Sequence, residues 1–492
     1  MRRAVWTCLV SGIAVFMVSM DNLVVTNALP VIRVSLGTGL EGLEWTVNAY
    51  TLMFAVFLLP GAALGDRFGR RRVFTVGMTI FTAASAAAAL APNVTALIAA
   101  RAVQGLGGAI VMPLTLTLLA SVVPPQRRGL AFGLWGGMGG LGVALGPVIG
   151  GGITEYATWE WIFWVNVPIG ILVLPLVALV RESRGGAGKL DPLGVLLVTA
   201  GLFGVVYGLV RGDSHGWTSG SVLAGLIGGG VLLLAFVAWQ ARLAAQPVGA
   251  AHSRRSTAAP MVPLSLFANR GFSLINAVSL VMAFGMFGTV FLSAQFLQTV
   301  QGYGPFAAGL RTLPWTAMPV IAAPLSGLLS DRIGGRRVVA ISLALQAAGI
   351  AWLSLVSAPS VGYARLVPPF VLAGLGMGLF FAPAARMTLG FAPRALEGVA
   401  SGTSNALRQL GTVLGVAVLS SVFASYGGYA NGQRFVHGMV AAQHVGAVVL
   451  AVAALLALAI PTMHAESTGE PTDTLGEPVA KSTGAVPVST LG

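Results

Sequence analysis

Residues Gly61-Ala-Ala-Leu-Gly-Asp66-Arg67-Phe-Gly69-Arg70-Arg71-Arg72 form a short polar stretch between two long apolar runs. A shorter copy returns later in the chain as Gly327-Leu-Leu-Ser-Asp331-Arg332-Ile-Gly334-Gly335-Arg336-Arg337. Glycines repeat in the same way and at a constant offset, which pairs Gly129, Gly142 and Gly146 with Gly398, Gly411 and Gly415. The repetition predicts two halves of similar build, with a segment that is not repeated between them.

The composition excludes most classes of soluble protein. The 492 residues are 56% hydrophobic and 9% charged, whereas an ordinary soluble domain carries about 25% charged residues. Lys and Arg fall in short clusters between apolar runs, as in the loops of a membrane protein, so nucleic acid is not an expected partner. Walker, Gly-x-Ser-x-Gly and Cys-x-x-Cys motifs are absent from the sequence. We therefore expect neither an enzyme nor a cofactor or metal site.

Fourteen apolar runs are candidates for membrane spans, which need about 20 residues each. The runs are continuous rather than alternating, which favours helices over a β-barrel. Two of them are short and rich in glycine, so a count of twelve spans with a buried hairpin also fits. The expected ranges are 5–29, 45–64, 73–91, 95–121, 129–153, 161–180, 193–210, 221–241, 272–298, 305–329, 337–357, 366–388, 399–423 and 438–461.

The expected fold is an all-α membrane protein of two six-helix halves with two extra helices between them. Positively charged residues gather in the loops on one side, which predicts both termini in the cytoplasm of a bacterial cell. We expect a monomer surrounded by membrane lipids. The predicted units are an N-terminal half (1–185), an inserted helix pair (186–245), a cytoplasmic linker (246–270), a C-terminal half (271–461) and a disordered tail (462–492).

Five motifs resemble the major facilitator superfamily and, within it, the fourteen-helix drug:proton antiporters. They are Met20-Asp21-Asn22-Leu-Val-Val-Thr26-Asn27-Ala-Leu-Pro30, the loop at 65–71, Arg101-Ala-Val-Gln104-Gly105, Gly142-Val-Ala-Leu-Gly146-Pro147-Val-Ile-Gly150-Gly151, and Trp159-Glu-Trp161-Ile-Phe163-Trp-Val-Asn166-Val-Pro168. Where the family often has Thr or Ser after the aspartate, this chain has Asn22. The resemblance implies a major facilitator fold and the efflux of hydrophobic drugs or antibiotics, cationic ones included, in exchange for protons.

Asp21 is the acidic residue that we expect to lie deepest in a span. A buried carboxyl needs a cavity or a partner, and Arg101 falls at a similar depth in its own segment. Burial favours the protonated carboxyl and the guanidinium favours the carboxylate, so the pair can take up and release a proton. The alternative is a static ion pair that only holds two helices together.

Two groups of residues are expected to control conformational change. By resemblance, Asp66, Arg67, Gly69 and Arg70 form a latch between the halves, with Asp66 near the start of the thirteenth helix, and Asp331 mirrors it toward the fifth. Gly142, Gly146 and Gly150 repeat every four residues and so share one face of a helix, which Pro147 kinks. This face is expected to make a tight contact between the halves, with ordinary helix packing as the alternative.

A drug cavity is mainly apolar with a few placed polar groups. Arg408 either lines this cavity or extends toward the inner surface. The same architecture could also export a metabolite or lipid-like compound, work as a facilitator without protons, or act as a receptor that transports nothing. The expected cavity residues are Asn22, Asn48, Gln104, Trp135, Asn276, Asn405 and Gln409.

Overall fold

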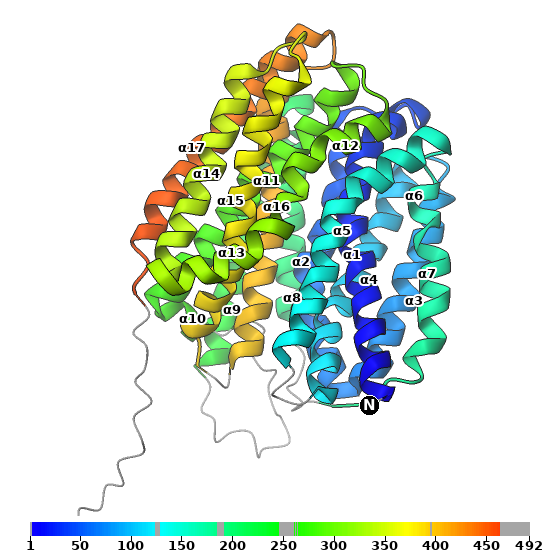
Figure 1. Ribbon diagram of the computed structural model, residues 1–492, viewed down its shortest axis with the longest axis vertical. Helices are drawn as coiled ribbons and strands as arrows, with labels where there is room; N and C mark the ends of the chain where they lie inside the picture. The colour runs from blue at the N-terminus through cyan, green and yellow to red at the C-terminus, as the bar shows by residue number, and fades with distance from the viewer. Residues whose placement is uncertain are drawn as a thin grey trace, which may run out of the picture.

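A computed structural model describes residues 2–123, 128–184, 191–245, 260, 262, 264–393 and 396–462. Within these ranges every regular element is a helix, and the long helices stand side by side in an elongated bundle (Figure 1). The expected all-α membrane class is therefore confirmed. The predicted tail from residue 463 and the linker segment 246–259 lie outside the described residues.

The N-terminal half and the inserted pair follow the expected order of segments. α1 begins at the lower end of the bundle in Figure 1, which we call the N-terminal end, and the opposite end is the far end. The helices are α1 (Arg2–Ser35), α2 (Leu40–Phe68), α3 (Arg70–Ala89), α4 (Val94–Val122), α5 (Arg128–Tyr156), α6 (Trp161–Trp164) and α7 (Asn166–Val177), followed by the inserted α8 (Pro192–His215) and α9 (Gly220–Ala244).

The C-terminal half repeats this arrangement after the short helix α10 (Ser265–Ala268). Its helices are α11 (Arg270–Thr299), α12 (Pro305–Thr316), α13 (Met318–Ile333), α14 (Gly335–Val356), α15 (Tyr363–Gly390), α16 (Glu397–Tyr426) and α17 (Gly432–Leu458).

Eleven of the described helices are long and apolar enough to cross a membrane, and thirteen spans result if each of two bent pairs counts as one. Proline accounts for the interruptions. The bend of 48° in α2 falls at Pro60, and α6 ends at Trp164, the residue whose carbonyl loses its helical partner because Pro168 has no N–H. Trp161–Val177 is a shorter apolar segment, so the expected fourteen spans are compatible with the structure.

The repeated glycines make the same helix contacts in both halves. A Cβ at Gly142 of α5 would lie 2.6 Å from the Phe16 carbonyl oxygen of α1, and one at Gly411 of α16 would lie 2.1 Å from the Leu280 carbonyl oxygen of α11. Each helix can approach its neighbour this closely only because the glycine lacks a side chain. The internal repeat in the sequence is thus a repeat of backbone packing.

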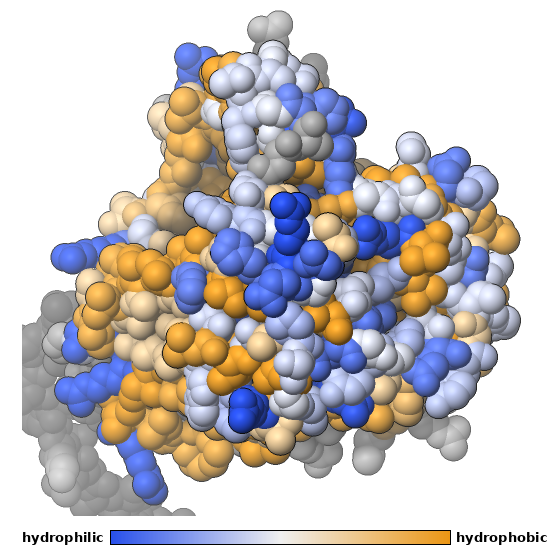
Figure 2. Space-filling view, turned by 90° about the horizontal axis from the view of Figure 1, so that it is seen from above, coloured by the Kyte–Doolittle hydropathy of each residue, from blue (hydrophilic) through white to orange (hydrophobic). Residues whose placement is uncertain are grey.

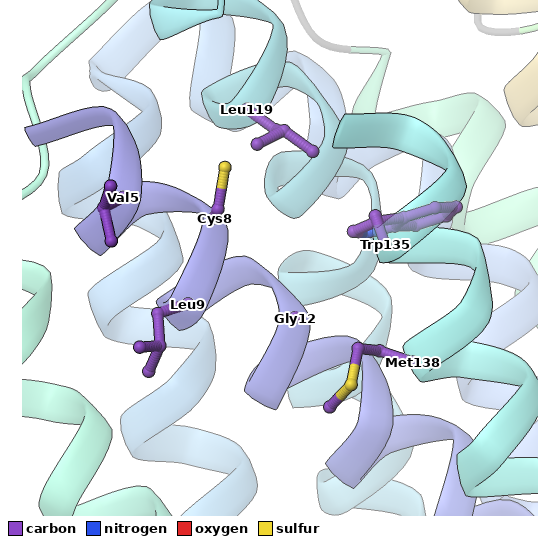
Figure 3. Close-up of a pocket in the computed structure, with 7 residues that line it drawn as sticks. All are labelled: Val5, Cys8, Leu9, Gly12, Leu119, Trp135 and Met138. Atoms are coloured by element: carbon purple, nitrogen blue, oxygen red, sulfur yellow. The ribbon is translucent and has the colours of Figure 1, made fainter. Parts of the chain in front are cut away.

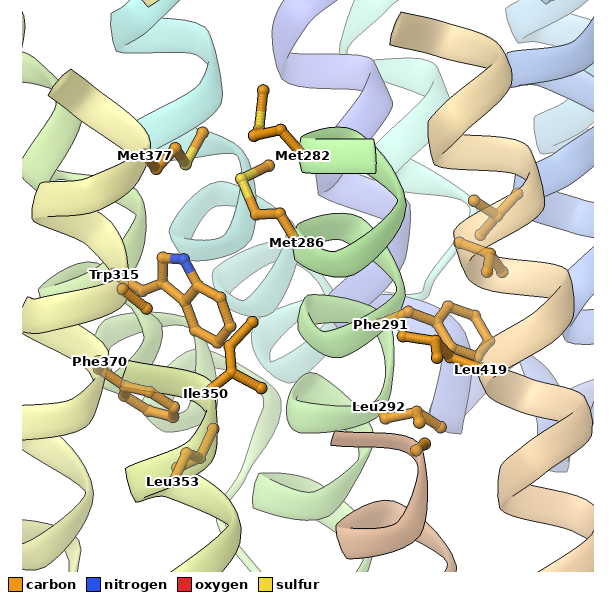
Figure 4. Close-up of a cluster of buried hydrophobic side chains, with 14 of the residues drawn as sticks. Met282, Met286, Phe291, Leu292, Trp315, Ile350, Leu353, Phe370, Met377 and Leu419 are labelled. Atoms are coloured by element: carbon orange, nitrogen blue, oxygen red, sulfur yellow. The ribbon is translucent and has the colours of Figure 1, made fainter. Parts of the chain in front are cut away.

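The core of the C-terminal half is rich in methionine and aromatic residues. Met282 and Met286 of α11, Met377 of α15 and Trp315 of α12 belong to one buried cluster, in which Phe370 lies beside Trp315 (Figure 4). These side chains are almost fully buried. Methionine adapts its shape to its neighbours, so this core can adjust when the helices around it shift.

Hydrogen bonds between the halves lie at the far end of the described bundle. Gln298 of α11 donates its amide to the carbonyl oxygen of Asn27 in α1 at 2.7 Å, and the Phe306 N–H of α12 donates to Glu155 of α5 at 2.8 Å. The Arg33 guanidinium lies 3.8 Å from the ring centre of Tyr429. Figure 2 looks onto this end, where hydrophilic residues gather between hydrophobic ones.

The inserted pair packs against both halves. Leu202 and Val206 of α8 join a buried cluster with Leu52 of α2 and Val413 of α16. At the start of α8, Asp191 accepts hydrogen bonds from Trp239 and Gln240 of α9 at 2.8 and 2.5 Å, and from the Gly194 N–H at 2.8 Å. The inserted helices therefore form a fixed hairpin beside the seam between α2 and α16.

Candidate functional site

The carboxylate of Asp21 lies at the centre of a buried polar cluster inside the N-terminal half. Arg101 of α4 donates to Oδ2 at 2.6 Å, and Gln104 of α4 and Asn166 of α7 each donate to Oδ1 at 2.8 Å. Asp21 and Arg101 are 0% and 1% exposed. A carboxylate with a cation and two amides around it is stabilised despite its burial.

Arg101 has contacts besides the one to Asp21. It donates to Gln104 Oε1 at 2.8 Å and to the Thr46 carbonyl oxygen at 3.3 Å, and its guanidinium lies 4.2 Å from the ring centre of Tyr50. These acceptors and the aromatic face would still hold the guanidinium if the carboxyl became neutral. The guanidinium is therefore held by several contacts besides its ion pair with Asp21.

The same cluster extends to a fourth helix through Ser85 of α3. Its hydroxyl accepts hydrogen bonds from Gln104 and Asn166, both at 3.2 Å, and donates to the Phe163 carbonyl oxygen at 2.9 Å. Asp21 thus connects α1, α3, α4 and α7. Neither Ser85 nor Asn166 was predicted as a partner of Asp21, although an amide in the apolar segment 161–180 was a usable signal.

The expected cavity residues separate into different environments. Gln104 belongs to the Asp21 cluster. Asn276 donates to the Phe272 carbonyl oxygen of its own helix at 2.8 Å, whereas neither amide atom of the buried Asn48 has a hydrogen-bond partner among the described residues. Asn22 is half-buried and Gln409 is buried.

Trp135 lines an apolar pocket near the N-terminal end of the bundle (Figure 3). The pocket has a volume of about 260 Å³ and lies between α1, α4 and α5. The indole N–H of Trp135 donates to Thr115 Oγ1 at 2.9 Å, which orients its ring. The other lining residues are Val5, Cys8, Leu9, Gly12, Leu119 and Met138.

Arg408 lies within the C-terminal half. Its guanidinium donates to the Asn405 side chain one turn earlier in α16 and lies 5.2 Å from the ring centre of Phe381 in α15. The side chain is partly exposed. The sequence left open whether Arg408 lines the cavity or extends toward the inner surface. In the structure its guanidinium lies between α15 and α16 and does not reach the end of its helix.

The loop around Asp66 is bound to the segment after α7. Asp66 accepts from Arg70 at 2.8 Å, and Glu182 accepts from the Arg71 N–H at 3.0 Å. Gly69 has a φ of +109°, and a Cβ there would lie 2.9 Å from the Glu182 carboxyl. The role of Glu182 was missed because this residue follows a span and resembles an ordinary loop residue.

Arg67 and Asp331, the other charged residues of the expected latch, each contact a side chain of their own half. Arg67 lies over the ring of Phe68, with 5.2 Å to the ring centre. Asp331 accepts from Arg386 of α15, in its own half, at 2.5 Å. Approaches of Asp66 to the start of α16 and of Asp331 to α5 stay predictions.

The α5 glycine face requires a correction. Gly142, Gly146 and Gly150 face α1, in the same half, and do not form the contact between the halves. That contact uses the adjacent face of α5: a Cβ at Gly151 would lie 2.1 Å from the Pro305 carbonyl oxygen of α12. The spacing of the glycines showed that they share a face, but it carried no information on the helix that this face meets.

The bundle of apolar helices, its internal repeat and a buried ion pair between spans define a multi-pass membrane transporter. Residues 11–197, 193–416 and 312–486 match the Major Facilitator Superfamily. The chain belongs to this superfamily, as the motifs in its sequence indicated.

Its relatives include named exporters and resistance proteins. The chain is 34% identical over 428 residues to multidrug resistance protein Stp of Mycobacterium tuberculosis (86% of this chain, 77% of the relative). It is 35% identical to the tetracenomycin C resistance and export protein of Streptomyces glaucescens (85% and 76%) and 37% identical to the cephamycin export protein CmcT of Amycolatopsis lactamdurans (83% and 83%).

Solved transporters share the fold at low sequence identity. A POT family transporter aligns with a TM-score of 0.68 at 14% identity, over 93% of this chain and 96% of that one. The nucleoside transporter NupG aligns with a TM-score of 0.62 at 13% identity, over 94% and 99%.

Proposed function

We propose that this protein exports hydrophobic drugs or antibiotics across the cytoplasmic membrane in exchange for protons. The observation that carries the proposal is the Asp21 cluster, because it holds the one acidic side chain that the described ranges place in the middle of a span. Relatives named for multidrug resistance and for the export of tetracenomycin C and cephamycin support the substrate class. We infer a transporter with no catalysed reaction.

Proton coupling requires Asp21 to change its protonation state without losing the surrounding structure. Arg101 remains held by Gln104, Thr46 and the Tyr50 ring when Asp21 becomes neutral. If Asp21 were the only partner of Arg101, a neutral Asp21 would leave the buried Arg101 charge without compensation. Such an uncompensated charge costs about 3–5 kcal/mol. The surplus of contacts to Arg101 therefore favours the coupling role.

Alternating access explains the distribution of contacts between the halves. Their hydrogen bonds and close backbone contacts lie at the far end. With both termini in the cytoplasm, as we propose, the structure is closed to the outside and would receive drug from inside. The pocket at Trp135 would then hold the apolar part of a drug near the inner end.

The decisive experiment is transport into inverted membrane vesicles, with and without a pH gradient, using tetracenomycin C and the neutral fluorescent probe N-phenyl-1-naphthylamine. Asp21→Asn should abolish the gradient-dependent transport. Because this change leaves Arg101 without its anion, the double variant Asp21→Asn/Arg101→Gln restores neutrality. Loss of coupling in both variants, with normal amounts of protein in the membrane, supports the proposal.

A static pair predicts the opposite result for the double variant, namely that it transports normally. Normal gradient-dependent transport by the double variant would therefore remove proton coupling through Asp21. Wild-type transport that ignores the gradient would instead favour a facilitator, and inactivity toward all drugs in the panel would favour an endogenous metabolite.

A further inference from the structure

We propose that Arg408 binds an anionic group of the exported compound. The substrates would then be apolar molecules that carry an acidic oxygen group such as a carboxylate, sulfonate or phenolate. This inference rests on the export function proposed above and specifies its substrate class. It replaces the cationic substrates that the family resemblance implies.

The guanidinium of Arg408 has unused capacity to bind an anion. Its contacts are the neutral oxygen of Asn405 and the face of Phe381, and within the described ranges no carboxylate lies at ion-pair distance from it. An arginine has five N–H donors in a planar fork, which matches the oxygens of a carboxylate or a similar group. The Phe381 ring beside it offers an apolar surface to the rest of the ligand.

The depth of Arg408 in the bundle indicates that it faces a cavity. It lies eleven residues after Glu397, the first residue of α16, which corresponds to about 16 Å along the helix. The side chain remains partly exposed at this depth. A charged group exposed in the middle of a membrane faces water or a ligand, not lipid.

The charges in the middle of the membrane leave a positive surplus. Asp21 and Arg101 neutralise one another, and Arg408 is a second cation without an acid beside it. The acidic side chains Glu155 and Asp331 lie at helix ends. A low-dielectric cavity with one excess positive charge attracts anions and repels cations.

The internal repeat shows that helix packing does not require a side chain at this position. Gly142 of α5 corresponds to Gly411 of α16, so Gly139 corresponds to Arg408. A Cβ at Gly139 would meet the side chains of Val15 and Ser19 at ordinary distances of 3.5 and 3.6 Å. The same position of the repeat therefore carries no side chain in one half and a guanidinium in the other.

The test compares two fluorescent probes that differ in charge. 1-Anilinonaphthalene-8-sulfonate and N-phenyl-1-naphthylamine share an aromatic skeleton, and only the first carries a sulfonate. Their affinities are measured for the full-length protein in phosphatidylcholine nanodiscs. We expect Arg408→Gln to weaken sulfonate binding about ten-fold or more and to leave the neutral probe unchanged.

Two variants serve as matched controls. Arg408→Lys keeps the charge and should retain most of the sulfonate affinity, and Arg434→Gln removes an exposed arginine at the far end and should change neither probe. Asn405→Asp is the alternative if Arg408→Gln does not fold, because it places a carboxylate beside the intact guanidinium. It should lower sulfonate binding in the same way.

Equal loss of both probes in Arg408→Gln would show a packing role and overturn the inference, as would unchanged sulfonate binding. Displacement of the sulfonate from the wild type by phosphatidylglycerol in the nanodisc would identify a lipid as the occupant and also overturn it. If only the inference about Arg408 is wrong, Arg408→Gln vesicles still transport the neutral probe when a proton gradient is applied. If the proposed export function is wrong, the wild type transports neither probe.

Discussion

Gly309 of α12 lies directly against the backbone of Pro147 in α5, so that a Cβ on the glycine would be 2.4 Å from the proline carbonyl oxygen. The two residues belong to different halves. Together with Gly151 and Pro305 they form a closure in which backbone meets backbone at the far end. Any side chain added at Gly309 must separate the halves here.

Gly309→Val should therefore destabilise the closed far end. Overpacking costs about 1–3 kcal/mol, which corresponds to about a ten-fold shift in the population of the closed state. The measurement is labelling of Val148→Cys by an impermeant maleimide in a Cys8→Ala background. Gly327→Val is the control, since a Cβ at Gly327 meets nothing within 4 Å. Unchanged labelling in Gly309→Val would contradict a closure made by this contact.

Removal of the Asn166 amide should change the pH dependence of transport. The amide donates to the Asp21 carboxylate, so Asn166→Ala removes one of the groups that hold the side chain proposed to exchange protons. The pH profile of vesicle transport should therefore differ from that of the wild type. The rate at neutral pH should fall about ten-fold.

Asn276→Ala provides the control for Asn166→Ala, because the Asn276 amide donates to the backbone of its own helix. Its pH profile should match that of the wild type. A profile that is identical in Asn166→Ala and in the wild type would argue against proton exchange at Asp21.

The pocket at Trp135 can be tested through Cys8, the single cysteine of the chain. Cys8 lines the pocket and is half-buried, so a membrane-permeant maleimide should label it. A bound drug should slow this labelling several-fold, and Trp135→Ala should remove the protection because the drug loses its aromatic neighbour. Trp217→Ala alters a tryptophan outside the pocket and should keep the protection. Equal labelling with and without transported drug would exclude this pocket from the drug path.

Gly69→Ala should destabilise the loop that joins α2 to α3. The residue has a φ of +109° and its added methyl group would meet Glu182, and such strain costs about 1–3 kcal/mol. Gly334→Ala has a comparable φ of +87° but meets nothing within 4 Å. The difference between their thermal unfolding midpoints isolates the contact with Glu182. Equal midpoints would show that only the backbone conformation matters.

Much of the fold could be predicted from the sequence, because each membrane span corresponds to one continuous apolar run. The cluster around Asp21 could be predicted only in part. Arg101 and Gln104 share a helix face by their spacing, and a buried carboxylate needs such partners. The position of Asn166 beside Asp21 depends on how α7 packs against α1 and α3, and this packing leaves no pattern in either segment.

The contacts between the halves were harder to predict for the same reason. A four-residue glycine spacing identifies a helix surface suited to close packing, and Gly142, Gly146 and Gly150 do pack closely. The spacing does not identify the helix that packs against this surface of α5. The three-dimensional structure shows that these glycines contact α1, whereas Gly151 contacts α12.

The inserted hairpin makes the molecule unequal on its two flanks. Leu202 and Val206 of α8 cover the seam between α2 and α16, and the described residues place no comparable helix over the seam between α5 and α12. A hydrophobic compound dissolved in the surrounding bilayer would therefore reach the boundary between the halves directly along α5 and α12, whereas α8 stands in front of the boundary along α2 and α16.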